Sequence, residues 1–97
     1  MTQSDPRLIA FRGFHANNPH VYAAFKQFAL QAAERRSHYS ARDIIHRVRW
    51  WSSIESNDPD GWKINNNWSP FYARLFERDH PELTGFFERR RSVADEV

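Results

Sequence analysis

Hydrophobic residues recur every three or four positions along two stretches of the chain, which is the spacing of one face of an α-helix. The first stretch contains Val21, Phe25, Phe28 and Ala32, and the second contains Ala41, Ile44, Ile45, Val48 and Trp51. Each follows a helix start signal. Asn18 precedes a proline, and Ser40 precedes Asp43 by three residues. The pattern predicts helices from Asn18 to about Arg36 and from Ser40 to about Glu55.

A third helix is predicted after Ser69-Pro70, which repeats the pairing of a capping residue with proline. Its hydrophobic stripe is Phe71, Tyr72, Leu75 and Phe76, it ends near Pro81, and Ala73, Arg74 and Glu77 are expected to face outward. Two shorter elements flank these helices. Residues 6–14 predict a helix or turn that packs Leu8, Ile9, Phe11 and Phe14 and ends at Gly13, and residues 82–91 predict a last helix that buries Leu83, Phe86 and Phe87.

Residues 57–61 contain a Pro-Asp-Gly turn signal, and Trp62–Ile64 then alternates like a short strand. This segment predicts either a small hairpin or an ordered loop. We therefore expect a mainly α fold: one small helical domain over residues 1–97, a compact bundle of three to five helices with frayed ends at about 1–5 and 92–97. A short two-stranded wing near 57–65 would make it resemble a helix-turn-helix or winged-helix protein. Roughly thirteen residues separate the second and third helices, however, whereas a standard helix-turn-helix uses three or four.

The composition excludes several classes of protein. No run of about 18 apolar residues is present, so a membrane-spanning protein is not expected. The N-terminus lacks a basic segment followed by an apolar one, and with no cysteine in the chain we expect a cytoplasmic protein without cysteine catalysis or a cysteine-bound zinc. The five histidines show no metal-ligand spacing, and no catalytic motif is present. We expect no metal, no cofactor and no enzyme activity.

Arginine dominates the positive charge of the chain. Twelve of the fourteen basic residues are arginine, and residues 35–50 contain five arginines but a single acid, Asp43. On a helical wheel, Arg42, His46 and Arg49 lie opposite the core-facing stripe of the second helix, with Arg47 and Trp50 beside them. Guanidinium groups suit phosphate and carboxylate partners, and an exposed indole suits stacking on a base or a side chain. A solvated surface with ion pairs is the alternative.

Three consecutive asparagines, Asn65, Asn66 and Asn67, precede the third helix. Asparagine amides pair with adenine edges, and the free backbone N–H groups of a helix start attract phosphate. These residues and Arg74 are therefore candidate contacts. Asparagine also forms local turns, so at least one of the three is expected to shape the helix entrance.

Four segments, "NPHVYAAFKQFAL", "YSARDIIHRVRW", "KINNNWSPFYARLF" and "DHPELTGFFERR", resemble a family of small, poorly characterised proteins of bacteriophages and bacterial genomes. The resemblance covers about His15 to Arg90. It implies a phage or prophage setting, in which compact arginine-rich proteins commonly bind nucleic acid or inhibit a host system. It assigns no catalytic residue. Trp68 stands where related sequences often have histidine, which puts an imidazole-dependent role at that position in doubt.

Together these features predict a small nucleic-acid-binding protein, with DNA favoured, that uses an arginine-rich helical face. The alternative is a protein-interaction module, such as an inhibitor of a host defence complex, that places the same arginine and aromatic surface on an acidic protein partner. The sequence leaves open whether the partner is DNA, RNA or protein, and whether the chain forms a homodimer.

Overall fold

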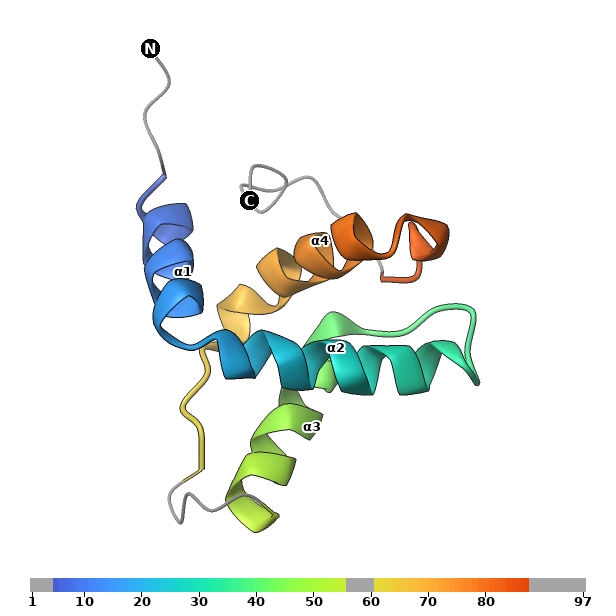
Figure 1. Ribbon diagram of the computed structural model, residues 1–97, viewed down its shortest axis with the longest axis horizontal. Helices are drawn as coiled ribbons and strands as arrows, with labels where there is room; N and C mark the ends of the chain where they lie inside the picture. Colours follow the sequence, from blue (N-terminus) through green and yellow to red (C-terminus); the bar gives the residue numbers. More distant parts are fainter. Residues whose placement is uncertain (1–4, 56–60, 88–97) are drawn as a thin grey trace.

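The computed structural model describes residues 5–55 and 61–87, which form four α-helices and two short 3-10 helices. The α-helices are α1 (Pro6–Asn17), α2 (Pro19–Ala33), α3 (Ala41–Ile54) and α4 (Ser69–Asp79), and the 3-10 helices are η1 (Asn66–Trp68) and η2 (Pro81–Leu83). In Figure 1, α2 crosses the middle of the molecule, α1 stands at one end, and α3 runs away from the others toward the bottom of the view. The predicted bundle of three to five helices is confirmed.

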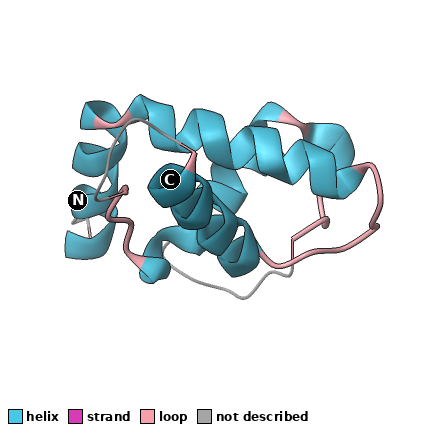
Figure 2. Cartoon of the chain, turned by 90° about the horizontal axis from the view of Figure 1, so that it is seen from below, coloured by secondary structure: helices cyan, strands magenta, loops and turns pink. Residues whose placement is uncertain are grey.

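The part of the chain that the structure describes contains helices and loops but no strand (Figure 2). Residues 61–65 are irregular, which fits the ordered loop expected as one of the two outcomes for this segment. Residues 57–60, the rest of the predicted wing, lie outside the described residues. The two-stranded wing therefore stays a prediction.

The predicted start of α3 is confirmed. The Ser40 hydroxyl accepts a hydrogen bond from the Asp43 backbone N–H at 3.4 Å, and the helix begins at Ala41. Asn18 precedes α2 as expected, but its side chain makes no capping bond to that helix. Its amide instead donates to the Phe14 carbonyl at 3.0 Å. Because Asn18 alone separates α1 from α2, it lies within reach of the free carbonyls at the end of α1.

The prediction that Ser69 caps the third helix is wrong. Ser69 has helical dihedral angles, φ −55° and ψ −42°, and is the first residue of α4. The preceding η1 turns the chain into a helical conformation one turn earlier. The side chain of Asn65 accepts a hydrogen bond from the Asn67 backbone N–H at 2.9 Å, so Asn65 caps this entrance.

Several other boundaries and contacts differ from the predictions. α1 runs to Asn17, so Gly13 lies within the helix, and Ile9 is 57% exposed and does not pack in the core. α2 ends at Ala33, three residues earlier than expected.

The predicted last helix is also shorter than expected. η2 covers Pro81–Leu83, and the chain then turns at Gly85, whose φ of +91° favours glycine. Phe86 and Phe87 are buried as predicted, whereas residues 88–91 lie outside the described residues. The expected frayed ends also lie outside them, except for Asp5, which caps α1 by accepting a hydrogen bond from the Arg7 backbone N–H at 2.8 Å.

The core is built from aromatic rings that meet around Tyr72 of α4. The Tyr72 ring centroid lies 4.9 Å from that of Phe11 on α1 and 5.5 Å from that of Phe25 on α2. Phe87 lies 5.6 Å from Phe25 and 5.5 Å from Phe76 of α4. Such ring pairs add to the free energy gained by burying their area. They place α4 inside the bundle and join α1, α2 and the segment after η2 to it.

Candidate functional site

The outward face of α3 presents three of the four basic residues predicted for it. Arg42, His46 and Arg47 are exposed, and Trp50 is 50% exposed. Arg49, which was predicted to face solvent, is instead half-buried, and its guanidinium nitrogens Nε and Nη2 are shielded from solvent without a hydrogen-bond partner among the described residues. The opposite face of α3 buries Ile44, Ile45 and Val48. One helix therefore has a hydrophobic side in the core and a cationic side toward solvent.

The carboxylates of the described residues do not pair with these cations. Ion pairs occur elsewhere in the described residues, between Arg7 and Asp5, between Lys26 and Asp79, and between His80 and Glu82. Within the described ranges, none of the five arginines from position 35 to position 50 forms an ion pair. Their positive charge is therefore available to a partner.

Arg47 is held in place by two aromatic rings. Its guanidinium carbon lies 4.6 Å from the centroid of the Phe28 ring on α2 and 4.8 Å from the centroid of the Trp50 ring on α3. Guanidinium groups stack favourably on aromatic faces, and the stacked geometry leaves their edge N–H groups free to donate. Trp50 therefore packs against Arg47 while half of its surface stays exposed to solvent.

The loop from 34 to 40 continues the positive surface from α3 to the end of α2. Arg35 and Arg36 are exposed there. The loop is fixed by a hydrogen bond from the Tyr39 backbone N–H to the Phe86 carbonyl at 3.0 Å and by a bridge between Tyr39 and Phe87. Tyr39 is 39% exposed and lines a groove together with Arg35.

Sequence reasoning missed Tyr39 and Gln31, which line a groove with Arg35 and Arg47. Gln31 follows Phe28 by three residues on α2, so their shared side of the helix was a usable signal. Tyr39 had no such signal, because its position depends on the bridge to Phe87, far along the chain.

The prediction that α4 presents Ala73, Arg74 and Glu77 outward is wrong. Their exposed fractions are 1%, 8% and 6%. The helix is covered on several sides, and Glu77 Oε2 accepts a hydrogen bond from the Gly85 backbone N–H at 2.7 Å. Arg74 is therefore not available as a surface contact, and we no longer include it in the candidate site.

Asn65, Asn66 and Asn67 are all exposed, and Asn65 caps η1 through its side chain. No hydrogen bond, ion pair or ring contact links them to the basic residues of α3 within the described part of the chain. This geometry agrees with the expectation that at least one asparagine shapes the helix entrance while others point toward solvent. The expected neighbour on α4, Arg74, is absent from their surface.

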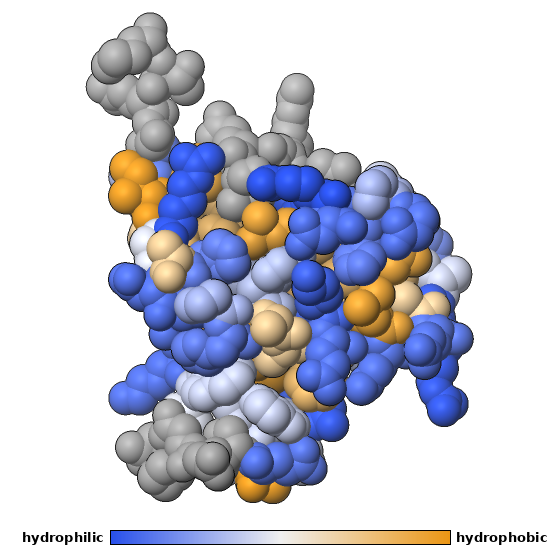
Figure 3. All heavy atoms as spheres, viewed as in Figure 1, coloured by the Kyte–Doolittle hydropathy of each residue, from blue (hydrophilic) through white to orange (hydrophobic). Residues whose placement is uncertain are grey.

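Hydrophobic side chains form no single large patch on the face drawn in Figure 3. Hydrophilic residues dominate this face, and hydrophobic ones appear as separate spots. Large exposed apolar patches mark many protein interfaces. This face therefore offers charge and hydrogen bonding more than apolar area.

Metal sites and membrane spans are two further classes of functional element. The described residues contain no group of three or more His, Cys, Asp or Glu side chains placed to hold a metal ion. None of their helices combines the length and the apolar character needed to cross a bilayer.

Comparison with known proteins supplies no family for this chain. No family model, curated protein or solved structure matches it. The resemblance to small phage and prophage proteins stays a prediction.

Proposed function

We propose that this protein binds nucleic acid, with DNA favoured, through the outward face of α3 and the loop that leads into it. The observation that carries the proposal is a run of five arginines from position 35 to position 50 without an ion pair among the described residues. Phosphate contacts from Lys and Arg release condensed counterions and supply most of the affinity of sequence-independent binding. This surface has the charge that such binding needs.

The shape of α3 supports the same function. It is a regular helix of fourteen residues with one side in the core and one toward solvent. A helix with its side chains is about 10–12 Å across, which fits the roughly 12 Å width of the DNA major groove. Because α4 is buried, α3 is the helix that we propose as the contact element. Asn66 and Asn67 are further contacts in this proposal.

A salt series tests it. Binding of labelled duplex DNA should weaken steeply between about 50 and 200 mM salt. The triple variant Arg36→Ala/Arg42→Ala/Arg47→Ala should bind more weakly to all sequences, and its salt slope should fall by about one for each phosphate that the variant no longer neutralises. A charge-matched control, Arg7→Ala/Arg12→Ala/Arg78→Ala, changes exposed arginines on α1 and α4. Equal effects of the two triple variants reject α3 as the binding surface.

The second candidate is a protein-interaction module, for example an inhibitor of a host defence complex. A specific observation favours it: Ile54 is 63% exposed and lies one turn from Trp50 on α3. Trp, Tyr and Arg are also enriched at protein interfaces. If DNA and RNA fail to bind at low salt, this candidate takes precedence. Ile54→Asp should then weaken binding to the protein partner, whereas it should change DNA affinity little.

A further inference from the structure

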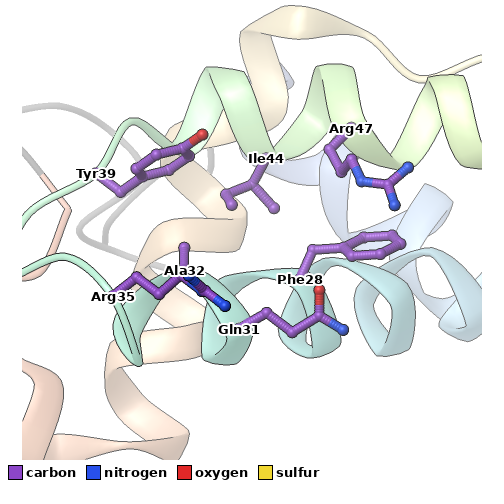
Figure 4. A pocket seen from close by; sticks show the side chains of 7 residues that line it. All are labelled: Phe28, Gln31, Ala32, Arg35, Tyr39, Ile44 and Arg47. Carbon is purple, nitrogen blue, oxygen red and sulfur yellow. The ribbon is translucent and has the colours of Figure 1, made fainter.

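A groove of about 260 Å³ lies between α2 and α3, beside the cationic surface. Figure 4 shows side chains of α2 and Arg35 on one side of it, and Tyr39 with the side chains of α3 on the other. Its lining residues are Phe28, Gln31, Ala32, Arg35, Tyr39, Ile44 and Arg47. The groove thus combines an apolar floor with an amide, a phenol and two guanidinium groups.

The two arginines of the groove have free donors. Neither Arg35 nor Arg47 forms an ion pair or hydrogen bond within residues 5–55 and 61–87. Stacking on Phe28 and Trp50 restricts the orientation of the Arg47 guanidinium, and its edge N–H groups remain available. An occupant that carries negative charge on both sides of an apolar centre fits these two arginines, which lie toward opposite ends of the groove (Figure 4).

The Tyr39 ring supplies a flat surface at the end of the groove away from Arg47 (Figure 4). Its backbone is fixed to Phe86 by the hydrogen bond of 3.0 Å, and Phe87, its bridge partner, is 1% exposed. The ring itself makes no aromatic contact with another described residue. It is therefore an exposed aromatic face on an anchored backbone, which suits base stacking.

We propose that this groove takes one unpaired nucleobase of a single-stranded nucleic acid. Tyr39 stacks on the base, the Gln31 amide hydrogen-bonds to its edge, and Arg35 and Arg47 contact the flanking phosphates. The proposal rests on the nucleic-acid-binding function above and names the preferred form of the ligand.

Size and chemistry select this occupant. The volume lies below the roughly 300 Å³ at the lower end of small-molecule pockets, so one planar ring fits better than an extended ligand. A carboxylate from an acidic protein satisfies the arginines but leaves the Tyr39 face and the Gln31 amide without a counterpart. A base within a duplex has both faces stacked and its pairing edge occupied, so the occupant must be unpaired.

The test compares one labelled single strand of about 12 nucleotides, within the usual site size, with the duplex of the same sequence. The full chain should bind the single strand more tightly. Tyr39→Ala should weaken single-strand binding by about 5- to 150-fold, the range for loss of one base stack, and leave duplex binding unchanged. Tyr39→Phe keeps the ring and should bind like the original chain.

Two further variants separate stacking from folding. Tyr39→Leu retains bulk without a π face and should lose single-strand affinity as Tyr39→Ala does, while its melting temperature stays near that of the original chain. Gln31→Ala should weaken binding and alter base preference. The matched control is Leu30→Ala, because Leu30 is exposed on α2 but does not line the groove.

The outcomes distinguish this inference from the function on which it rests. If single strand and duplex bind alike, depend on Arg42, and ignore changes at Tyr39 and Gln31, the groove proposal is overturned and the function of α3 stands. If neither DNA nor RNA binds, both proposals are overturned. Binding of a Glu-rich peptide that Arg35→Ala weakens would then assign the groove to an acidic protein partner.

Discussion

Helices α3 and α4 have similar sequence patterns but opposite surroundings. Each has a hydrophobic stripe and an arginine on its predicted outer side. In α3 that outer side is exposed and carries Arg42, His46 and Arg47, whereas in α4 the corresponding Arg74 and Glu77 are buried. The difference arises from position: α3 lies at the edge of the bundle and α4 lies within it. A helical wheel finds the most hydrophobic side of a helix, but the number of packed neighbours decides what happens to the other side.

The charged groups of the two helices consequently have different roles. Glu77 of α4 accepts a hydrogen bond from the Gly85 backbone N–H and so fixes the turn that brings Phe86 and Phe87 into the core. The exposed arginines of α3 hold no other part of the described chain through an ion pair. We infer that substitutions in α4 act on stability and those in α3 act on binding.

The largest contrast is expected between Phe76→Ala in α4 and Trp50→Ala in α3. Phe76 is 0% exposed and packs against Phe87, so its truncation should lower the free energy of unfolding by about 3–5 kcal/mol. Trp50 is 50% exposed, and its loss removes mainly the contact with Arg47, which should cost less than about 1 kcal/mol. Urea unfolding measures both. Similar losses for the two variants would show that α3 is packed as tightly as α4.

The next contrast concerns charged residues. Glu77→Ala leaves the Gly85 N–H without its acceptor and should cost about 1–3 kcal/mol. Arg42→Ala changes an exposed residue and should stay within about 0.5 kcal/mol. Thermal unfolding at several denaturant concentrations separates these values. A large cost for Arg42→Ala would mean that the α3 surface stabilises the fold, and its role in binding would lose support.

The comparison also explains which parts of the structure could be predicted from the sequence. α2 and α3 were predictable because hydrophobic spacing and capping residues depend on local sequence. The burial of Arg74 was not, because it depends on how the helices assemble. Ser69 was misplaced for a related reason: η1, which Asn65 caps, begins the helical conformation before the Ser-Pro signal.

The candidate site also has one part that local sequence predicts and one part that depends on the assembled fold. Arg42, His46 and Arg47 were predictable from the amphipathic pattern of a single helix. The groove was not, since it needs α2, α3 and the bridge between Tyr39 and Phe87, residues distant in sequence.

A smaller effect on stability is expected from the buried Tyr72 of α4 at alkaline pH. Burial raises the pKa of the Tyr72 hydroxyl above its usual value near 10. The folded chain therefore keeps Tyr72 neutral where the unfolded chain ionises, so this contribution to stability is present below about pH 10 and is lost as pH rises further. The loss should be about 1.4 kcal/mol per pH unit, and Tyr72→Phe should remove it. An identical alkaline slope in Tyr72→Phe contradicts the assignment.

The smallest expected effects lie at the entrance to α4, where the asparagine run connects the buried helix to the surface. Asn65→Ala removes the hydrogen bond to the Asn67 N–H and should cost about 1 kcal/mol, as for other capping residues. Asn66→Ala changes an exposed side chain and should alter stability by less than about 0.5 kcal/mol. At least one of Asn66→Ala and Asn67→Ala should weaken DNA binding at an unchanged melting temperature. The reason is that a side-chain amide outside the turn's hydrogen bonds can bond to DNA without stabilising the turn. If all three substitutions lower the melting temperature and none changes DNA affinity, the whole run belongs to the scaffold of α4, and the binding surface is confined to α3 and the loop before it.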